Sequence, residues 1–344
     1  CKFRRITFFL CITLHTYRCV PNLRFRMRSS LFVVAALACI ALAVFAAHDD
    51  FDRWVQKHGK TYANDVEYQH RREIFHQNRL LVHKMNSLKD GARYELNLFA
   101  DMTPDEHKGM YRGWAVPEAM KSAPQGSFKV ADPTPTSWDW RTKGAVTEVK
   151  NQGQCGSCWS FSTTGNVEGQ WFLAGHTLTS LSEQQFVDCD KVDQGCNGGL
   201  PSNAFEYAIK AGGIESEASY PYTAVGGSCQ FSASKVVSKI SNWTAVSTDE
   251  DTIASVLAST GPLSIGINAE WMQFYAGGVS DPMFCNPKAL DHGVLIVGFG
   301  TQDSKPYWII KNSWGPTWGE KGYYLIIRGK GKCGLNTMVT TSIV

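Results

Sequence analysis

Acidic residues are missing from the first 46 residues of the 344-residue chain, although that stretch carries seven Lys and Arg residues. Residues 47–133 carry 13 basic and 13 acidic residues, and residues 134–344 carry 14 and 18, which gives net charges of 0 and −4. The lack of a basic patch argues against nucleic acid as a partner, because binding phosphates requires clustered positive charge. The length predicts about two globular units, since one domain usually spans roughly 100–200 residues.

A long membrane-spanning run is also missing. The apolar stretch at residues 31–47 is shorter than the ~20 residues that a spanning helix needs. It follows a short basic start at Met27 and ends in small residues, a pattern typical of a secretory signal peptide cut after Ala46. We therefore expect a signal peptide at residues 27–46 rather than a membrane anchor, with residues 1–26 as translated upstream sequence. A signal peptide predicts a secretory route to a lysosome, an endosomal vacuole or the extracellular space.

Cysteine is absent from residues 47–133, and the character of the chain changes around residues 115–135, where Pro, Ser, Gly, Ala and Lys predominate. Helical spacing of apolar residues predicts helices upstream of this stretch, which we expect to be an exposed linker. Further downstream, apolar and β-branched runs predict strands at 263–267, 294–299, 307–311 and 323–327. We expect a helical unit at residues 47–133 and an α+β unit at residues 134–344.

The cysteines downstream of the linker are odd in number: Cys155, Cys158, Cys189, Cys196, Cys229, Cys285 and Cys333. In an oxidising compartment six of them would form three disulfides and one thiol would remain free. The count predicts a free cysteine but does not identify it.

Cys158 stands where a Gly-rich segment enters a helical pattern that runs to about residue 172. A cysteine in the first turn of a helix lies at the positive end of the helix dipole, which favours the thiolate. Cys155 precedes the helix and is better suited to a disulfide. Cys158 alone could equally be half of a disulfide, which is the usual state of cysteine in a secreted protein.

Histidine is scarce downstream of the linker, with only His176 and His292. His176 follows Gly175 at the end of a helical pattern, whereas His292 begins a strand. If a hairpin is centred on Gln302, His292 directly faces Asn312, and Cβ atoms of opposed residues lie ~5 Å apart. The Asn amide could then orient the imidazole as the partner of a thiolate nucleophile.

Two other readings of the cysteines are open at this point. Cys155 and Cys158 form a Cys-x-x-Cys pair before a helix, as in a thiol–disulfide oxidoreductase. That reading would leave five other cysteines, again an odd number, and the strand–helix alternation of such a fold is missing. A zinc site would draw on Cys155, Cys158, Cys189 and Cys196.

The segments 152–161, Asp291-His292-Gly293 and Asn312-Ser313-Trp314-Gly315 resemble the papain family of cysteine proteases, in its cathepsin L-like branch, and the resemblance covers residues 50–344. It implies a cysteine endopeptidase that uses a thioester acyl-enzyme and no metal or cofactor. The implied catalytic residues are Cys158 as nucleophile, His292 as acid–base, Asn312 as the group orienting the imidazole and Gln152 as oxyanion donor. A catalytically inactive homologue is disfavoured, because all four positions are intact.

The same resemblance implies a two-lobed α+β fold, in which a helical lobe and an antiparallel barrel-like lobe flank the active site. It implies the disulfides Cys155–Cys196, Cys189–Cys229 and Cys285–Cys333, which leave Cys158 free. The pocket for the second residue before the cleaved bond is expected at Leu200, Pro201, Gly266, Leu290 and Met338. Further substrate contacts are expected at Gly156, Gly198, Gly199, Asp291 and Trp314. The pocket carries no charge, so Leu, Phe or Val should be preferred there over Arg.

A second signature lies upstream, where Glu67, Arg71, Phe75, Asn78, Val82 and Asn86 are spaced as in the inhibitory prosegments of papain-like enzymes. Asn97, Phe99 and Asp101 match the shorter motif that follows. The resemblance implies a zymogen in which residues 47–133 inhibit residues 134–344. The expected partners are polypeptide substrates and cystatin-like inhibitors, with a monomeric enzyme and no stable membrane insertion.

Six of the nine histidines lie in the expected prosegment: His48, His58, His70, His76, His83 and His107. Imidazoles titrate near ~6.5, so acidification would charge the prosegment selectively, and we hypothesise that this weakens its docking. Solvated histidines on helix surfaces are the alternative. Asn242 begins an Asn-x-Thr sequence and is a candidate glycosylation site.

Overall fold

The computed structural model describes residues 50–110, 123–128 and 132–344, and the chain divides into a unit of residues 1–57 and a unit of residues 58–344. In the first unit the described residues, 50–57, are helical. The predicted signal peptide lies outside the described residues. Among the residues that are described, no helix combines the length and hydropathy needed to cross a membrane.

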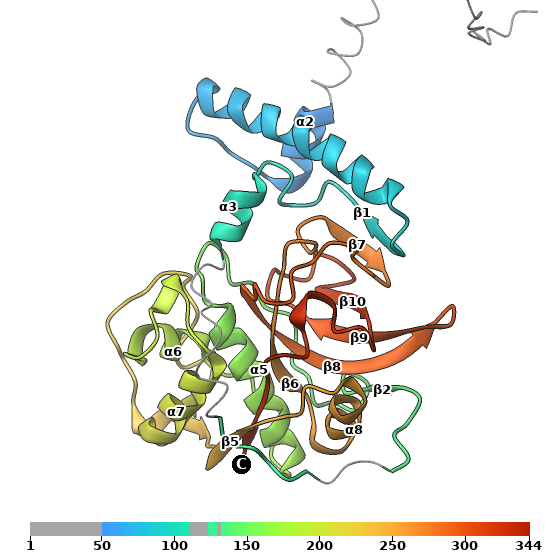
Figure 1. Cartoon of the computed structure of the whole chain (residues 1–344). Helices are drawn as coiled ribbons and strands as arrows, with labels where there is room; N and C mark the ends of the chain where they lie inside the picture. Colours follow the sequence, from blue (N-terminus) through green and yellow to red (C-terminus); the bar gives the residue numbers. More distant parts are fainter. Residues whose placement is uncertain (1–49, 111–122, 129–131) are drawn as a thin grey trace, which may run out of the picture. The chain divides into compact units, whose positions relative to one another are not determined.

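The second unit contains helices and antiparallel strands in mixed order (Figure 1). Its helices are α2 (Asp65–Ser87), α3 (Pro104–Gly109), α5 (Cys158–Leu173), α6 (Glu183–Cys189), α7 (Pro201–Ala211) and α8 (Glu250–Thr260), with 3₁₀ turns η1 (Gly195–Asn197), η2 (Ala233–Lys235) and η3 (Lys332–Gly334). Its strands are β1 (Ala92–Tyr94), β2 (Trp138–Asp139), β3 (Ile214–Glu215), β4 (Val236–Ser238), β5 (Asn242–Ala245), β6 (Leu263–Ile267), β7 (Tyr275–Gly278), β8 (His292–Gln302), β9 (Lys305–Lys311), β10 (Tyr323–Ile327) and β11 (Val339–Ile343).

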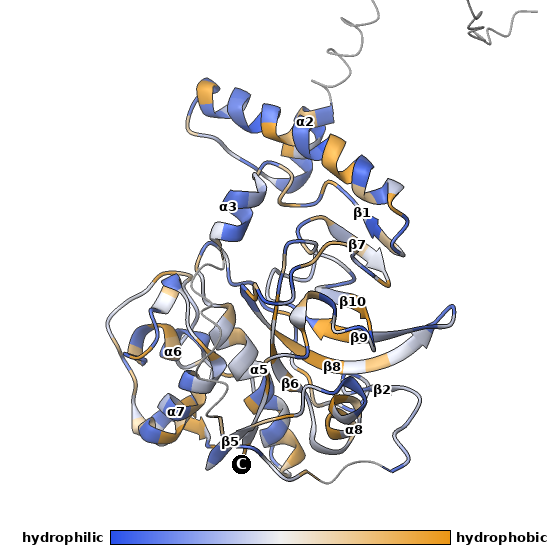
Figure 2. Cartoon of the chain, in the orientation of Figure 1, coloured by the Kyte–Doolittle hydropathy of each residue, from blue (hydrophilic) through white to orange (hydrophobic). Residues whose placement is uncertain are grey.

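The main sheet has the strand order β10-β9-β8-β6-β11-β5, with β2 paired to β8, and all its pairings are antiparallel. Strand β6 and residues 292–300 of β8 are buried on both faces, which explains why they appear as continuous apolar runs and not as alternating patterns. Figure 2 shows hydrophobic residues concentrated in the strands of this sheet. The four predicted strands all fall inside β6, β8, β9 and β10, and the predicted helix at 158–172 is α5.

Helix α5 contacts the sheet at β8 and packs on its other side against α6 and α7 (Figure 1). The Ser162 hydroxyl donates to the Val294 carbonyl at 2.7 Å. Gly165 allows the close approach, because a Cβ there would lie 3.0 Å from the Leu295 side chain. This tight contact brings the N-terminal end of α5 and the beginning of β8 to the same place.

The prosegment helix α2 is tied to the chain that follows it by the residues of the predicted motif. Asn78 donates to the carbonyls of Ala100 and Met102 at 2.9 and 2.8 Å, and Arg71 binds Glu106 at 2.8 Å. Strand β1 then pairs with β7, which lies after the linker in the same unit of residues 58–344. The motif therefore fixes the shape of the prosegment, and β1 joins it to the enzyme.

The hairpin register expected from the sequence is wrong. Strands β8 and β9 are joined by a two-residue turn, and both of its residues, Asp303 and Ser304, have positive φ angles of 49° and 63°. The register also shifts between Ile296 and Gly298. The strand partner of His292 is Ile267 in β6, so His292 does not face Asn312 across the hairpin.

Most of the described linker residues are exposed, as the composition predicts, but the chain is held at residues 123–125. The Pro124 carbonyl accepts hydrogen bonds from the Ala245 N–H at 2.8 Å and the Thr244 hydroxyl at 2.9 Å. Ala123 is buried against the core. Residues 123–125 therefore extend the edge of the main sheet beside β5.

Candidate active site

Cys158 is the first residue of α5 and the free cysteine of the described chain. Its side chain is buried, which raises the pKa of the thiol, while the nearby backbone N–H of Gly293 acts to lower it. Since Gly293 follows His292 directly, this contact brings the sulfur next to the start of β8.

His292 is held by an amide whose orientation the backbone determines. The Nε2 atom lies 2.8 Å from Asn312 Oδ1, and the Ser313 N–H donates to the same oxygen at 2.8 Å. An atom that accepts from a backbone N–H must be the amide oxygen, so Nε2 of the imidazole is the donor. Nδ1 is then the nitrogen left to exchange a proton with another group. The contact expected from the sequence is present, although the register from which it was inferred is not.

The indole of Trp314 stacks on the His292 ring, with centroids 4.9 Å apart and planes inclined by 23°. Both residues are buried. The indole therefore covers one face of the imidazole, and it restricts the motion of the ring.

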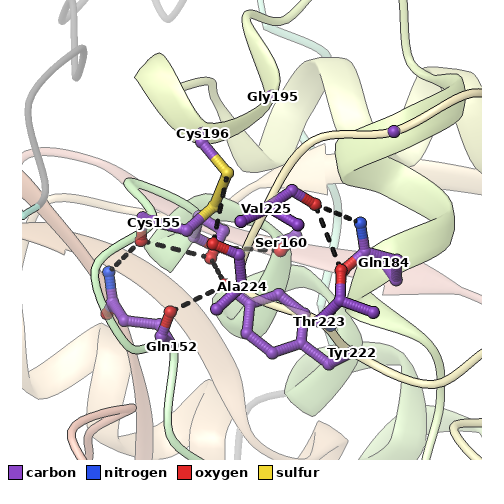
Figure 3. Close-up of a disulfide and its surroundings, with 12 residues drawn as sticks. Gln152, Cys155, Ser160, Gln184, Gly195, Cys196, Tyr222, Thr223, Ala224 and Val225 are labelled. Carbon is purple, nitrogen blue, oxygen red and sulfur yellow. Dashed lines mark hydrogen bonds between the residues drawn. A yellow bond between two sulfur atoms is a disulfide. The ribbon is translucent and has the colours of Figure 1, made fainter.

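Gln152 is fully buried and fixed at both ends of its side chain. Its Oε1 accepts from the Ser313 hydroxyl at 2.7 Å, and its Nε2 donates to the Cys155 carbonyl at 3.0 Å. Figure 3 shows Gln152 beside the Cys155–Cys196 disulfide. The amide nitrogen is thereby directed toward the start of α5.

Burial shifts the proton equilibria of the site toward neutral groups. It raises the pKa of the Cys158 thiol to about 12 and lowers the pKa of His292 to about 4. The helix dipole favours a thiolate at Cys158, but excluding water from the sulfur costs more. In this covered state burial therefore favours a thiol and a neutral imidazole over a thiolate and an imidazolium.

The cover is the prosegment. His107 of α3 packs against Phe99 and Trp314, with centroids 4.7 Å from each, and Phe99 contacts Trp314 at 5.6 Å. The three rings therefore form a cluster whose indole stacks on His292. The Met110 carbonyl then lies 3.4 Å from Gln152 Nε2. His107 and Met110 of the predicted prosegment thus contact Trp314 and Gln152.

The residues expected to bind substrate fall into two groups. The Gly266 N–H donates to the Met338 carbonyl at 3.1 Å, and Leu290 and Met338 are both buried in the main hydrophobic core. Pro201 is the first residue of α7, and Leu200 directly precedes it. The partly buried Leu200 side chain packs against the same core. Nearer the nucleophile, the Gly156 N–H donates to the Cys196 carbonyl at 2.8 Å, while Asp291 accepts from the Ala269 N–H at 2.8 Å. Gly198 and Gly199 are also buried.

Among the described residues three disulfides are present: Cys155–Cys196, Cys189–Cys229 and Cys285–Cys333. Cys155 is bonded to Cys196 and not to Cys158, so the two cysteines of the Cys-x-x-Cys pattern do not form a redox pair. Three of the four cysteines considered for a zinc site are in disulfides, Cys155 with Cys196 and Cys189 with Cys229, and only Cys158 is free among them. The disulfides are structural and do not favour an oxidoreductase.

Some residues at the site were not singled out by the sequence. Ser313 holds the Gln152 side chain, and His107 with Met110 covers the site from the prosegment. His107 was one of six prosegment histidines, and nothing in its local sequence separates it from the others. His70 and His83 are exposed on α2, whereas His107 is 1% exposed.

Comparisons with known proteins agree with this geometry. Residues 134–343 match the papain family of cysteine proteases, and residues 51–107 match the cathepsin propeptide inhibitor domain. The chain is 48% identical over 318 residues to a probable cysteine protease, RD19C, of Arabidopsis thaliana, covering 86% of this chain and 84% of that protein. It is 46% identical over 317 residues to cysteine proteinase 1 of Dictyostelium discoideum, covering 86% and 92%.

Solved precursors have the same fold. The digestive procathepsin L 3 of Tenebrio molitor larval midgut superposes with a TM-score of 0.79 at 37% identity, over 87% of this chain and 99% of that one. The recombinant stem bromelain precursor gives a TM-score of 0.79 at 34% identity, over 87% and 99%. The two-lobed fold with a helical prosegment, the free cysteine and the inhibitor domain all lead to one assignment. The chain belongs to the papain family of cysteine proteases, and it is the zymogen of a cysteine endopeptidase that carries its own prosegment inhibitor.

Proposed function

We propose that Cys158 is the nucleophile of this endopeptidase and that His292, oriented by Asn312, is its acid–base. One observation carries the proposal: the free cysteine at the N-terminus of α5 lies beside the start of β8, where an amide fixes the imidazole tautomer. In the uncovered enzyme, water and the helix dipole favour proton transfer from the thiol to His292 Nδ1, which gives a thiolate and an imidazolium.

The thiolate attacks the carbonyl carbon of the scissile peptide, so a C–S bond forms and the carbonyl electron pair moves onto oxygen. The Cys158 backbone N–H and the Gln152 amide donate to that oxyanion. When the C–N bond breaks, the imidazolium gives its proton to the departing amine. A water molecule then attacks the thioester while His292 accepts its proton, the C–S bond breaks, and the acid product leaves.

The prosegment inhibits by occupying this site. The Met110 carbonyl lies where the proposed oxyanion donor Gln152 can reach it, at 3.4 Å. We propose residues 47–133 as the removable prosegment and residues 134–344 as the mature enzyme. Removal would hydrate Cys158 and His292, which would bring both pKa values back toward their ordinary ranges.

The selective subsite is proposed at Leu200, Pro201, Gly266, Leu290 and Met338, for the second residue before the cleaved bond. Leu290 and Met338 are buried apolar side chains, and no charge is present to pair with a cation. A Leu or Phe side chain would gain about 1.5–3 kcal/mol from burial there. Gly156, Gly198, Gly199, Asp291 and Trp314 would line the adjoining subsites.

The route and partners are proposed from the same family membership. A signal peptide at residues 27–46 would direct the precursor to the secretory pathway, to a lysosome or endosomal vacuole, or out of the cell. We expect a monomer that cystatin-like inhibitors block. Asn242 is exposed at the start of β5 and is proposed as a glycan site, which a mobility shift after glycosidase treatment would test.

Replacing Gln152 and His292 separately tests the roles. Gln152→Ala should lower kcat by about 10²–10³-fold with a smaller change in KM, as expected for loss of one oxyanion donor. His292→Ala should lower kcat further, since both proton transfers lose their carrier. Hydrolysis of a fluorogenic peptide by the processed variants provides both constants, and a variant with unchanged kcat would remove that residue from the mechanism.

A further inference from the structure

Ser157 occupies the N-cap position of α5, but its side chain makes no capping hydrogen bond. No hydrogen bond runs from its hydroxyl to the first turn of α5. A serine at this position normally accepts from a backbone N–H two or three residues on. Instead its Oγ lies 2.5 Å from the hydroxyl of Tyr222, 65 residues away.

The donor and acceptor in the hydrogen bond between Ser157 and Tyr222 follow from the second hydrogen bond of the Tyr222 hydroxyl. The Tyr222 hydroxyl lies 2.8 Å from the backbone carbonyl of Gln152, and a carbonyl can only accept. Tyr222 therefore donates to Gln152, and Ser157 donates to Tyr222. One phenolic oxygen joins the backbone at residue 152 to the residue directly before Cys158. Figure 3 shows Tyr222 beside Gln152.

Tyr222 is itself held firmly. Its ring packs edge-on against Phe161 in the first turns of α5, with centroids 4.9 Å apart. Its N–H donates to Glu217 at 2.8 Å, and the next residue, Thr223, is bound by Gln184 at 2.9 Å (Figure 3). The hydroxyl is therefore a fixed point relative to α5.

The segment that this hydroxyl braces has little regular structure of its own. Residues 152–157 contain two glycines, and the Cys155–Cys196 disulfide fastens their middle. Tyr222 fastens both ends. These ends carry the two groups proposed to bind the oxyanion: the side chain of Gln152, and the N–H of Cys158, which directly follows Ser157.

We propose that Tyr222 and Ser157 are positioning residues that set the spacing between the two oxyanion donors. The inference rests on the proposed roles of Gln152 and Cys158. Neither hydroxyl touches the substrate. Their effect is confined to states in which the carbonyl oxygen carries negative charge, because the donors are needed fully only there.

A peptide aldehyde reports on such a state, since the thiolate adds to its carbonyl and leaves a tetrahedral oxyanion or hydroxyl at the same place. The corresponding peptide alcohol binds the same subsites without adding to sulfur. The affinity ratio of aldehyde to alcohol therefore measures the oxyanion site separately from the subsites. The concentration of active enzyme is fixed in each sample by titration of its free thiol.

In processed Tyr222→Phe enzyme, which keeps the ring contact with Phe161, we expect kcat to fall about tenfold, less than the ~10²-fold or greater loss from removing a donor outright. KM and alcohol affinity should stay unchanged, and aldehyde affinity should fall by the same factor as kcat. Ser157→Ala should act in the same direction. The matched control is Tyr220→Phe, whose hydroxyl donates to Asp188 at 2.8 Å and should leave the ratio unaltered.

An unchanged ratio in Tyr222→Phe, or an equal loss of aldehyde and alcohol affinity, would overturn the inference. Gln152→Ala separates this outcome from failure of the proposed function. If Gln152→Ala lowers the ratio and Tyr222→Phe does not, only the positioning role is wrong. If neither substitution lowers it, the proposed oxyanion site is wrong as well.

Discussion

At the scale of single residues, Met338 makes the specificity proposal testable. Its side chain is buried, and its carbonyl accepts the Gly266 N–H that lines the same region. The thioether is flexible, so aliphatic and aromatic side chains should both fit beside it. The wild-type enzyme should prefer Leu, Phe or Val over Arg at the second position before the cleaved bond.

Met338→Glu should raise cleavage of Arg-containing peptides relative to Leu-containing ones by about tenfold or more, because hydrogen bonds to charged groups contribute roughly 1.5–3 kcal/mol. The effect should be larger above the carboxyl pKa than below it. Paired fluorogenic peptides that differ only at this position give the ratio, and Met338→Gln is the uncharged control. A wild-type preference for Arg would show that the pocket has been placed wrongly.

The residue scale also shows where counting along the chain fails. The sequence identified Cys158, His292, Asn312 and Gln152 through spaced motifs, and the His–Asn contact is present at 2.8 Å. The hairpin that suggested it is offset, because Asp303 and Ser304 adopt positive φ angles and the register shifts near Val297. Neither feature has a local signal as strong as an Asn-Gly turn.

At the scale of elements, the proposed meeting of nucleophile and base depends on the contact between α5 and β8. Gly165→Val should destabilise the enzyme by about 1–3 kcal/mol, because the added side chain would overlap Leu295, from which even a Cβ is only 3.0 Å away. Urea unfolding of the Cys158→Ser precursor measures the loss without self-digestion. Gly226→Val is the matched control, since a Cβ there meets nothing within 4 Å. Equal stability of the two variants would contradict the packing argument.

The short helix α3 was the least predictable functional element. Its sequence is hydrophilic, as Figure 2 shows, yet it buries His107 between Phe99 and Trp314. Burial, and then the nearby His292, lower the pKa of His107 to about 3. The other charged groups facing this region are Lys108 and Asp291, whose charged atoms lie 3.7 Å apart. Tertiary contact, and not sequence, distinguishes His107 from exposed His70 and His83.

The sign of the pH effect follows from that shift. The released prosegment binds a proton on His107 near pH ~6.5, whereas the docked prosegment resists it until pH about 3. The contribution of His107 to docking is therefore complete above pH ~6.5. As the pH falls from ~6.5 toward 3, the equilibrium constant for docking of the prosegment decreases by about tenfold per pH unit. Of the six prosegment histidines in the hypothesis, His107 is therefore the one expected to produce most of the pH effect.

His107→Phe keeps a ring in the aromatic stack and removes the titration. Between pH 6.5 and 4.5 the acid-induced gain in prosegment removal should shrink by up to about 100-fold relative to the parent. The substrate is the Cys158→Ser precursor, cleaved by a fixed amount of processed enzyme, so the ratio between precursors cancels the pH dependence of the added enzyme. His83→Gln, at an exposed position, should match the parent. Equal pH dependence of His107→Phe and the parent would remove the idea.

At the scale of the whole molecule, one chain contains both an enzyme and the prosegment, whose contacts favour the uncharged forms of the Cys158 thiol and the His292 imidazole. Prosegment motif residues fold α2 onto the segment at 97–106, β1 pairs with β7, and α3 covers Cys158 and His292. The family motifs allowed the sequence to predict the division into inhibitor and enzyme. They did not predict the neutral thiol and imidazole, because that state depends on water excluded by distant segments.

The central claim is that one cysteine, Cys158, is silent in the precursor and becomes the reactive nucleophile after the prosegment leaves. The most direct measurement is alkylation of the precursor expressed from Met27, before and after acid processing. Peptide mass analysis locates the label, and hydrolysis of a fluorogenic peptide is followed in the same samples. Processed Cys158→Ser is the control for labelling elsewhere.

We predict negligible alkylation of the precursor at neutral pH, since the covered thiol has a pKa raised to about 12. After processing, one label per chain should appear at Cys158, and activity should fall in proportion to it. Peptidase activity that survives complete alkylation of Cys158, or a label divided between Cys155 and Cys158, would contradict the account.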